Sequence, residues 1–435
     1  MLLIYSPRSS PRLDYVLQVF FNELIPIDFS FTANAQEFMD FKGAKINYSS
    51  SGQGDGVFLF AHELLFQKGI HQQKISVTEW KNIKTIFAHQ VRSDLPFDPF
   101  AGAFYLLSRY EEYLPFAPDN HGRFPDQASL NFREGFHEIP VVNYYAKFLK
   151  EILREKFTFL VFKSSSYKFQ LTYDIDFAFA YKGKGILRNA AGFTKALLKF
   201  NLKEIKNRAG VLSGKRADPY DTYEYQFSLH KRFNLRPVYF FLPGDYGRFD
   251  KNVFWKKKSF QDLIQKIVAQ NDIGIHSSYA SNLYPEKILI EKERLAMIAG
   301  EKIFRNRQHF LRLRFPFTYK NLLAYQINED YSMGYASLTG FRAGIAAPFR
   351  WYHLEDEKIT DLRIFPFAVM DASLYYYMKL SPLQALQKAV QLIDEVKKVN
   401  GTFQFLAHND FLSEQFLWKG WREKFREIIE YGSDH

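Results

Sequence analysis

The sequence predicts an α/β protein with two domains: a smaller α/β domain at residues 1–160, followed by a parallel α/β sheet or barrel at residues 165–435. Three observations support this prediction. The chain has 435 residues, more than a single hydrophobic core usually holds. After residue 165, apolar strand-like segments alternate with helical segments, as in parallel α/β folds. Acidic residues and histidines follow several of these strands, where such folds bind ligands.

The first 160 residues mix short strands with helices. We expect strands at 2–6 and 56–61, and helices at 11–24, 98–114 and 141–157. Asp98 is the expected N-cap of the second of these helices. Arg109 lies beside Glu111 and Glu112, and we expect an ion cluster at the surface or between the domains. The domain boundary is expected near the serine-rich segment 163–168.

The second part of the chain alternates between strands and helices. The strand candidates are 169–175, 237–242, 272–278, 309–313, 331–336, 362–369 and 402–408. Amphipathic helices are expected at 259–270, 285–303 and 381–401. Ser259 is the expected N-cap of the first, and Ser381 followed by Pro382 begins the last.

Composition narrows the chemistry and the location. Hydrophobic residues make up 47% of the chain and no low-complexity run occurs, so we expect an ordered protein. The absence of cysteine excludes disulfides, a thiolate nucleophile and cysteine-ligated zinc. The first residues do not resemble a signal peptide, and no run of apolar residues is long enough to span a membrane. We therefore predict a soluble, cytoplasmic protein.

The net charge of +11 suggests an acidic partner such as a membrane surface, an anionic glycan or nucleic acid. The charge is concentrated at residues 181–216, a basic insertion with ten Lys or Arg residues and the single acid Glu204. Its segment 192–208 has apolar residues at helical spacing, as in helices that contact a membrane surface. The alternative, a solvated helix packed on its own domain, is favoured. Specific nucleic-acid binding ranks last, because no nucleic-acid motif accompanies the charge.

Two acids and two histidines lie at predicted strand ends: Asp174, Asp176, His276 and His408. Side chains two residues apart on a strand point the same way, so Asp174 and Asp176 can face one site. A divalent cation would relieve the repulsion between them, and with histidine it suits zinc, or nickel, cobalt or manganese. Such a metal lowers the pKa of bound water from ~15.7 to about 7, which suits hydrolysis of an amide or ester.

These residues, in this order, resemble the polysaccharide deacetylases of the NodB type (carbohydrate esterase family 4). The similar phrases include "TYDID", "GIHSS", "RFPFT" and "FLAH", and "DYSMGYASLTGFRAG" and "FPFAVMDASL" fit a bacterial subgroup. In that subgroup a distinct N-terminal domain precedes the barrel, and residues 1–160 resemble it. The resemblance implies a distorted (β/α)7-type barrel that removes acetyl groups from glycans with a divalent metal, for which zinc suits these ligands best.

The resemblance also implies roles for individual residues. Asp174 takes the place of the general base, and Asp176 serves as the metal ligand although it stands one position later than in the family. His276 matches the first histidine ligand. Ala280 stands where the second is expected, so His309 in "RQHF" is the candidate replacement.

The remaining matches assign His408 as the general acid and several residues to substrate binding. The arginine that steadies the base matches Arg314, with Arg307 and Arg312 as competitors for this role. The other candidates for contact with the sugar are Arg342, Trp351 and Asp371, of which Asp371 can instead orient a histidine.

The predicted function is a metal-dependent carbohydrate N-deacetylase, a hydrolase of C–N bonds other than peptide bonds. Its substrate would be an acetylated amino-sugar glycan or a lipid-linked precursor, with peripheral membrane contact through residues 181–216. The alternative is a catalytically inactive or repurposed protein of the same fold that binds glycans or assists envelope assembly. The absence of histidine at position 280 favours this alternative.

Overall fold

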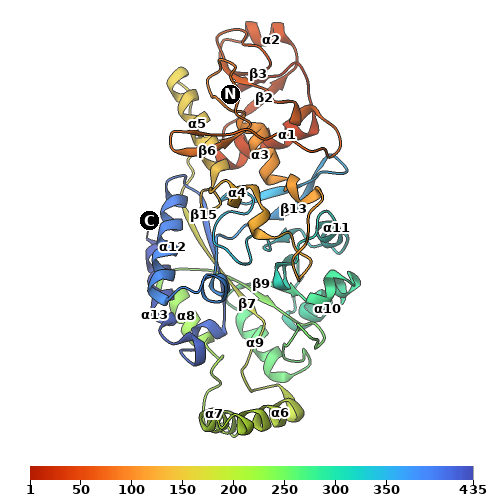
Figure 1. The fold of residues 1–435 in the computed structure, drawn as a ribbon, viewed down its shortest axis with the longest axis vertical. Helices are drawn as coiled ribbons and strands as arrows, with labels where there is room; N and C mark the ends of the chain where they lie inside the picture. Colours follow the sequence, from red (N-terminus) through yellow and green to blue (C-terminus); the bar gives the residue numbers. More distant parts are fainter. Residues whose placement is uncertain (435) are drawn as a thin grey trace.

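The structure, a computed structural model, describes residues 1–434. Its first domain contains a parallel sheet in the order β2-β1-β3-β4 and a separate antiparallel hairpin, β5-β6. The strands are β1 (Leu2–Tyr5), β2 (Phe29–Thr32), β3 (Ala44–Ser49), β4 (Val57–Phe60), β5 (Val77–Trp80) and β6 (Ile83–Ile86). The helices are α1 (Pro11–Gln18), α2 (Ala35–Asp40), α3 (Pro99–Leu107), α4 (Leu130–Arg133) and α5 (Val141–Lys156). This part, red to yellow in Figure 1, forms one end of the molecule.

The second domain is built on a sheet of nine strands in the order β12-β13-β11-β10-β9-β8-β7-β15-β14. These are β7 (Lys168–Ile175), β8 (Val238–Phe241), β9 (Asp272–Ser277), β10 (Arg305–Gln308), β11 (Glu329–Asp330), β12 (Phe349–His353), β13 (Lys358–Ile364), β14 (Val369–Met370) and β15 (Thr402–His408). All neighbouring strands are parallel except β12, which pairs antiparallel with β13 at the edge. The α/β class and the parallel sheet expected from the sequence are therefore confirmed.

Eight helices accompany this sheet among the described residues. They are α6 (Gly185–Leu198), α7 (Leu202–Leu212), α8 (Tyr223–Arg232), α9 (Lys258–Val268), α10 (Glu286–Ala299), α11 (Phe317–Ala324), α12 (Pro382–Lys397) and α13 (Trp421–Ser433). The predicted cap at Ser381 is present and is part of a capping box: the Ser381 hydroxyl accepts a hydrogen bond from the Gln384 N–H, and the Gln384 side-chain oxygen accepts one from the Ser381 N–H. The described chain contains no helix with the length and apolarity needed to cross a bilayer.

The strand order shows that this sheet curls. Its two outermost parallel strands, β13 and β14, are consecutive in the chain and are joined by residues 365–368 alone. In a flat sheet their seven inter-strand spacings of about 4.8 Å would separate them by about 34 Å, whereas this connection spans at most about 18 Å. The sheet therefore bends towards a barrel, which brings the carboxyl ends of its strands together. In the described chain it does not close, since no pairing joins β14 to β12 or β13, and a sevenfold (β/α) barrel is not confirmed.

Several predicted strand positions were wrong for identifiable reasons. The strand expected at 309–313 is β10, four residues earlier, and its residues Asn306 and Arg307 are polar but buried and hydrogen bonded. The apolar segment 309–313 instead forms a turn. The strand expected at 362–369 is broken into β13 and β14 by the connection across the open side of the sheet.

A buried ion cluster joins the first 160 residues to the part of the chain that contains the nine-stranded sheet. Glu112 accepts hydrogen bonds from Arg109 Nε at 2.8 Å and from Arg342 Nε and Nη2 at 3.0 and 2.6 Å. All three side chains are buried. Burial raises the pKa of Glu112, but the charges of Arg342 and Arg109 outweigh it and hold this pKa below its usual value. The ion cluster predicted around Arg109 thus lies between the domains.

This cluster predicts that two substitutions of an acidic residue by alanine differ strongly in their effect on the free energy of unfolding. Glu112→Ala leaves the buried guanidinium of Arg342 without its carboxylate and Arg109 with Glu111 alone, so we expect the free energy of unfolding to fall by about 3–5 kcal/mol. Asp361→Ala, which removes an exposed pair with Arg350, serves as the control and should have a much smaller effect. Urea unfolding followed by circular dichroism measures both, and equal losses would contradict the proposed role of the cluster.

Candidate active site

The curled sheet brings the carboxyl ends of β7, β9, β10 and β15 to one place. In the parallel register, Asp174 of β7 lies beside His408 of β15. His276 of β9 lies beside Arg307 of β10, and the chain continues into His309 directly after β10. Because β10 ends five residues earlier than expected, His309 stands at a strand end like the other histidines.

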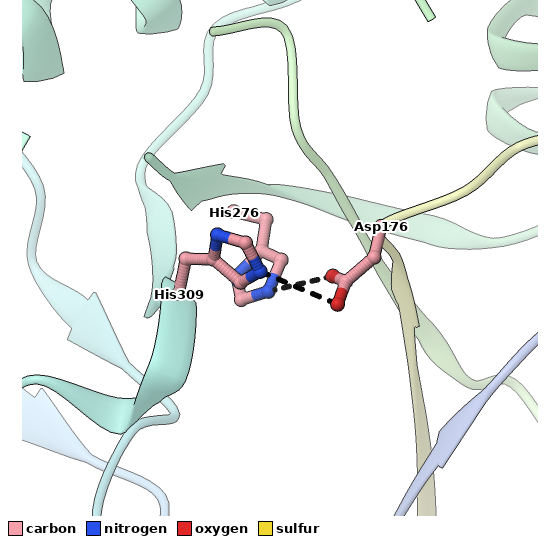
Figure 2. A group of neighbouring side chains, drawn as sticks. All are labelled: Asp176, His276 and His309. Atoms are coloured by element: carbon pink, nitrogen blue, oxygen red, sulfur yellow. Dashed lines mark ion pairs between the residues drawn. The ribbon is translucent and has the colours of Figure 1, made fainter. Parts of the chain in front are cut away.

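Asp176, His276 and His309 form a compact group of possible metal ligands, with one donor atom from each side chain lying within 4.8 Å of the others. Asp176 Oδ1 is 3.1 Å from His276 Nε2, and Asp176 Oδ2 is 3.3 Å from His309 Nε2. Figure 2 shows the two imidazoles side by side, facing the carboxylate of Asp176. The structure brings together the three residues that the sequence suggested as a metal-binding set.

Hydrogen bonds orient both imidazoles for metal binding. His276 Nδ1 lies 2.9 Å from the carbonyl oxygen of Arg307, and His309 Nδ1 lies 2.7 Å from Asp250 Oδ1. Because both partners are acceptors, each Nδ1 carries the proton, and a neutral ring then directs the Nε2 lone pair at Asp176. Asp176 Oδ1 is buried and has no hydrogen-bond partner. One carboxylate and two such imidazoles match the ligand preference of zinc.

In this group a proton and a metal ion would compete for the same nitrogen and oxygen atoms. Burial lowers the pKa of His309, but Asp176 and Asp250 outweigh it and raise that pKa to about 9. Burial raises the pKa of Asp176, whereas the charge of His309 and the close approach of both imidazoles hold it well below its usual value. A metal bound at Nε2 of His309 would replace this proton, so its affinity depends on pH.

Asp174 is held by a different partner. Its Oδ1 accepts a hydrogen bond from Arg307 Nη1 at 3.0 Å, and the same Nη1 also contacts Thr172 Oγ1. Arg307 is fully buried, its Nε donates to the Tyr331 carbonyl, and its guanidinium stacks on Phe240 at 4.7 Å. Asp174 Oδ2 remains 3.6 Å from His276 Nε2. Asp174 is therefore held by Arg307 at the edge of the metal-ligand set.

His408 faces this group from the opposite side. Asp371, which follows β14, binds the His408 backbone N–H through Oδ2 at 2.6 Å and lies 2.7 Å from its Nδ1 through Oδ1. The Nε2 atom is 3.8 Å from Asp176 Oδ2. Burial lowers the pKa of His408, but the Asp371 carboxylate outweighs it and raises this pKa well above its usual value. The Asp371 carboxylate therefore favours the protonated form of His408. Asp371 orients a histidine, one of the two roles considered from the sequence.

These side chains line a cavity of about 280 Å³. Sequence reasoning missed much of its wall, which includes Arg123 of the first domain, Phe310, Tyr376, Tyr377, Asp410 and Trp418. Asp410 stands two residues after His408, and burial raises its pKa to about 6. Phe310 and Leu311 have φ angles of 59° and 52°, a conformation that costs bulky residues about 1 kcal/mol or more each. This strained turn places both beside His309 in the cavity wall.

Three of the residues expected to bind substrate lie elsewhere. Arg314 is exposed on the surface, where its guanidinium stacks on Phe317. Arg342 belongs to the ion cluster between the domains. Trp351 is buried in β12 against Tyr319. None of the three lines the cavity, so the structure does not support their predicted contact with substrate.

Of the three arginines considered as partners of the base, only one reaches it among the described contacts. Arg307 binds Asp174 directly. Arg312 donates to the backbone carbonyls of His121 and Tyr279 instead. The motif match to Arg314 pointed to the wrong arginine because β10 ends before the segment that carries the motif.

Known proteins match this chain over part of its length and at low identity. A family model described as "Family of unknown function (DUF7033)" matches residues 2–158. No curated protein matches the chain significantly. The chain is similar to the crystal structure of a putative polysaccharide deacetylase from Mycobacterium smegmatis, with 14% identity, coverage of 62% of this chain and 85% of that chain, and a TM-score of 0.42.

Two further solved structures show similarity at the same level. A probable polysaccharide deacetylase from Pseudomonas aeruginosa PAO1 has 12% identity, coverage of 62% and 86%, and a TM-score of 0.41. Puue allantoinase has 12% identity, coverage of 62% and 85%, and a TM-score of 0.41. Similarities this weak do not establish an activity or a substrate for this chain.

The geometry predicts a graded loss of metal affinity. We expect the purified apoprotein to bind one equivalent of Zn²⁺ in isothermal titration calorimetry. Asp250→Asn, which disturbs the orientation of His309, should weaken binding by about 10–100-fold, and His309→Ala should weaken it further. His71→Ala, at an exposed histidine outside the cavity, should leave the affinity unchanged. Wild-type affinity in His309→Ala would exclude His309 as a ligand.

Proposed function

We propose that this chain is a metal-dependent hydrolase that removes acetyl groups from an amino-sugar glycan or its lipid-linked precursor. The main support is the convergence in one cavity of three groups with distinct partners. These are the ligand set of Asp176, His276 and His309, the carboxylate of Asp174 held by Arg307, and the imidazole of His408 held by Asp371. Such a combination supplies a metal site, a base and an acid.

Asp174 acts as the general base in this proposal. Its carboxylate accepts a proton from the water that attacks the acetyl carbonyl carbon, and the hydrogen bond from Arg307 orients it. The C–N bond then breaks, and His408 gives its Nε2 proton to the departing amine nitrogen. The products are acetic acid and the free amino sugar, and the proton that Asp174 took from water returns to His408 to complete the cycle. His408 is suited to this role because Asp371 keeps it protonated.

Asp176, His276 and His309 would hold the metal, with zinc as the best fit for one carboxylate and two imidazoles. A bound divalent metal supplies polarisation of the acetyl carbonyl and acidification of water. The substrate class is supported by the cavity wall, where Trp418 and Tyr376 offer aromatic surface to a sugar ring and Asp410 offers a carboxylate to its hydroxyls. The resemblance to NodB-type enzymes leads to the same substrate class.

The alternative of a non-catalytic glycan-binding protein rested on Ala280 in the place of a ligand. The donor atoms of His309 lie with those of His276 and Asp176 inside the 4.8 Å group, which supports a replacement from the next strand. The support for an intact hydrolytic site is therefore stronger than it was from the motif alone.

Acetate release from N-acetylated amino-sugar oligosaccharides tests the proposal. We expect activity in zinc-loaded protein, loss of activity on chelation and recovery when zinc is restored. Asp174→Asn and His408→Ala should each lower kcat by about a hundredfold or more, since each removes a proton-transfer group. Asp361→Asn and His71→Ala, at exposed positions, are the matched controls. Zinc-loaded protein that releases no acetate from any such substrate would contradict the proposal.

The pair of His408 and Asp371 predicts a shift in pH dependence. His408 must be protonated to act as the acid, and Asp371 raises its pKa, so wild-type kcat should persist into alkaline solution. In Asp371→Asn that support is lost, the folded-state pKa of His408 falls, and the alkaline limb of the kcat profile should move to lower pH. A pH–rate profile from pH 5 to pH 10, about the range stable proteins tolerate, measures the shift. An unmoved alkaline limb would assign the acid to another group.

A further inference from the structure

The basic insertion forms a helical hairpin that projects from the second domain. Its helices α6 and α7 are joined by a short turn at residues 199–201. In Figure 1 the hairpin lies at the end of the molecule opposite the first domain. The sequence favoured a single helix packed on its own domain. The structure differs, because among the residues of α6 and α7 only Asn189, Ala196 and Arg208 are buried.

The base of the hairpin is firmly attached. The carboxylate of Asp218 accepts hydrogen bonds from the backbone N–H groups of Ala180, Tyr181 and Lys182, which joins the start and the end of the insertion. Arg188 of α6 also donates to the carbonyls of Lys251 and Asn252 in the adjacent loop, which adds a second attachment. The hairpin is therefore carried on an ordered support.

The two helices are held together from within. Arg208 of α7 donates to the Asn189 side chain of α6 at 3.0 Å and pairs with Glu204 at 2.8 Å. Its guanidinium lies over Gly192, where a Cβ atom would be only 2.3 Å from it, so a larger residue at this position would displace the guanidinium. The single acid of the insertion is thus used inside the hairpin.

Large apolar side chains of the hairpin face solvent. The exposed fractions are 89% for Ile186, 85% for Leu187, 76% for Leu198, 90% for Phe200 and 73% for Leu202. Along α6, exposed small or apolar residues recur at 187, 190, 191, 197 and 198, the spacing of one helix face. Phe200 occupies the tip of the turn with a φ angle of 50°. Such a concentration of exposed apolar surface marks an interaction site.

The charge around these side chains is strongly positive. Seven exposed basic residues accompany them: Lys182, Lys195, Lys199, Lys203, Lys206, Lys215 and Arg216. Because Glu204 is paired with Arg208, it does not offset the positive charge that a binding partner would meet. Apolar side chains interleaved with lysines are the pattern of helices that lie in the interface of an anionic bilayer. A second copy of the same hairpin would bring like charges together, which disfavours self-association.

We propose that the α6–α7 hairpin docks the protein on membranes that contain anionic phospholipids. Phe200 and the leucines enter the acyl boundary, and the exposed lysines contact the headgroups. The hairpin follows β7 closely: the loop after Asp176 carries Phe177, which lines the cavity and contacts Lys184 at 5.6 Å. Docking would hold the cavity near the membrane surface. This interaction is independent of the proposed hydrolysis, because it uses none of the residues that carry the chemistry.

Co-sedimentation of the full-length protein with vesicles tests the proposal. We expect binding to phosphatidylcholine vesicles that contain phosphatidylserine, little binding to phosphatidylcholine alone, and weakening as salt increases. The double variant Leu198→Ser/Phe200→Ser should lower the partition coefficient at least about tenfold. Lys199→Glu/Lys203→Glu should do so as well, since each basic residue near the surface is worth about fivefold. Met297→Ser and Lys302→Glu change exposed residues outside the hairpin and are the matched controls.

Each possible result of the vesicle experiment either supports or overturns membrane docking by the hairpin. Binding that requires phosphatidylserine and is lost only in the hairpin variants supports it, provided that their melting temperatures match the wild type. Wild-type protein that ignores both vesicles, or hairpin variants that bind like the controls, would overturn it. Dimerisation that the Leu198→Ser/Phe200→Ser variant abolishes, without vesicle binding, would assign the surface to a second copy instead. Since no activity is measured, failure here leaves the proposed hydrolysis unaffected.

Discussion

Arg307 connects the two halves of the candidate site. Its buried guanidinium binds Asp174, and its backbone carbonyl oxygen accepts a hydrogen bond from Nδ1 of His276. One residue therefore orients the proposed base and also sets the tautomer of a proposed metal ligand. A buried guanidinium is costly without a carboxylate, so the pair with Asp174 is also a condition for the packing of β7 against its neighbours.

Two carboxylates as close as those of Asp174 and Asp176 repel each other, and this repulsion is reduced because each has a different cationic neighbour. Asp174 is paired with a guanidinium, which stays charged at all relevant pH values. Asp176 faces two imidazoles, which can exchange a proton for a metal. The strand ends supply this separation, because the curl of the sheet carries β10 and β15 to opposite sides of Asp176. The fold and the chemistry are linked through that curl.

The sequence predicted the residues that follow apolar strands and missed those positioned by tertiary contacts. Asp174, His276 and His408 could be found because each ends a recognisable buried strand. His309 was suggested only as a substitute for position 280, since β10 is short and its buried polar side chains do not resemble a strand. Asp250 and Arg123 come from loops and Trp418 from a 3-10 turn, and no local pattern marks their approach to His309 or to the cavity. The hairpin was read as one helix because its turn at residues 199–201 lies within a continuous helical spacing of apolar residues.

The central claim is that Asp176, His276 and His309 bind one metal ion in the cavity that also contains Asp174 and His408. The most direct measurement is an anomalous difference map from crystals of the full chain grown with zinc, collected at the zinc absorption edge. The account predicts a single strong peak bound by Nε2 of His276, Nε2 of His309 and the carboxylate of Asp176, at about 2.0–2.2 Å from each. A zinc peak outside this group, or no peak within it at saturating zinc, would contradict the account.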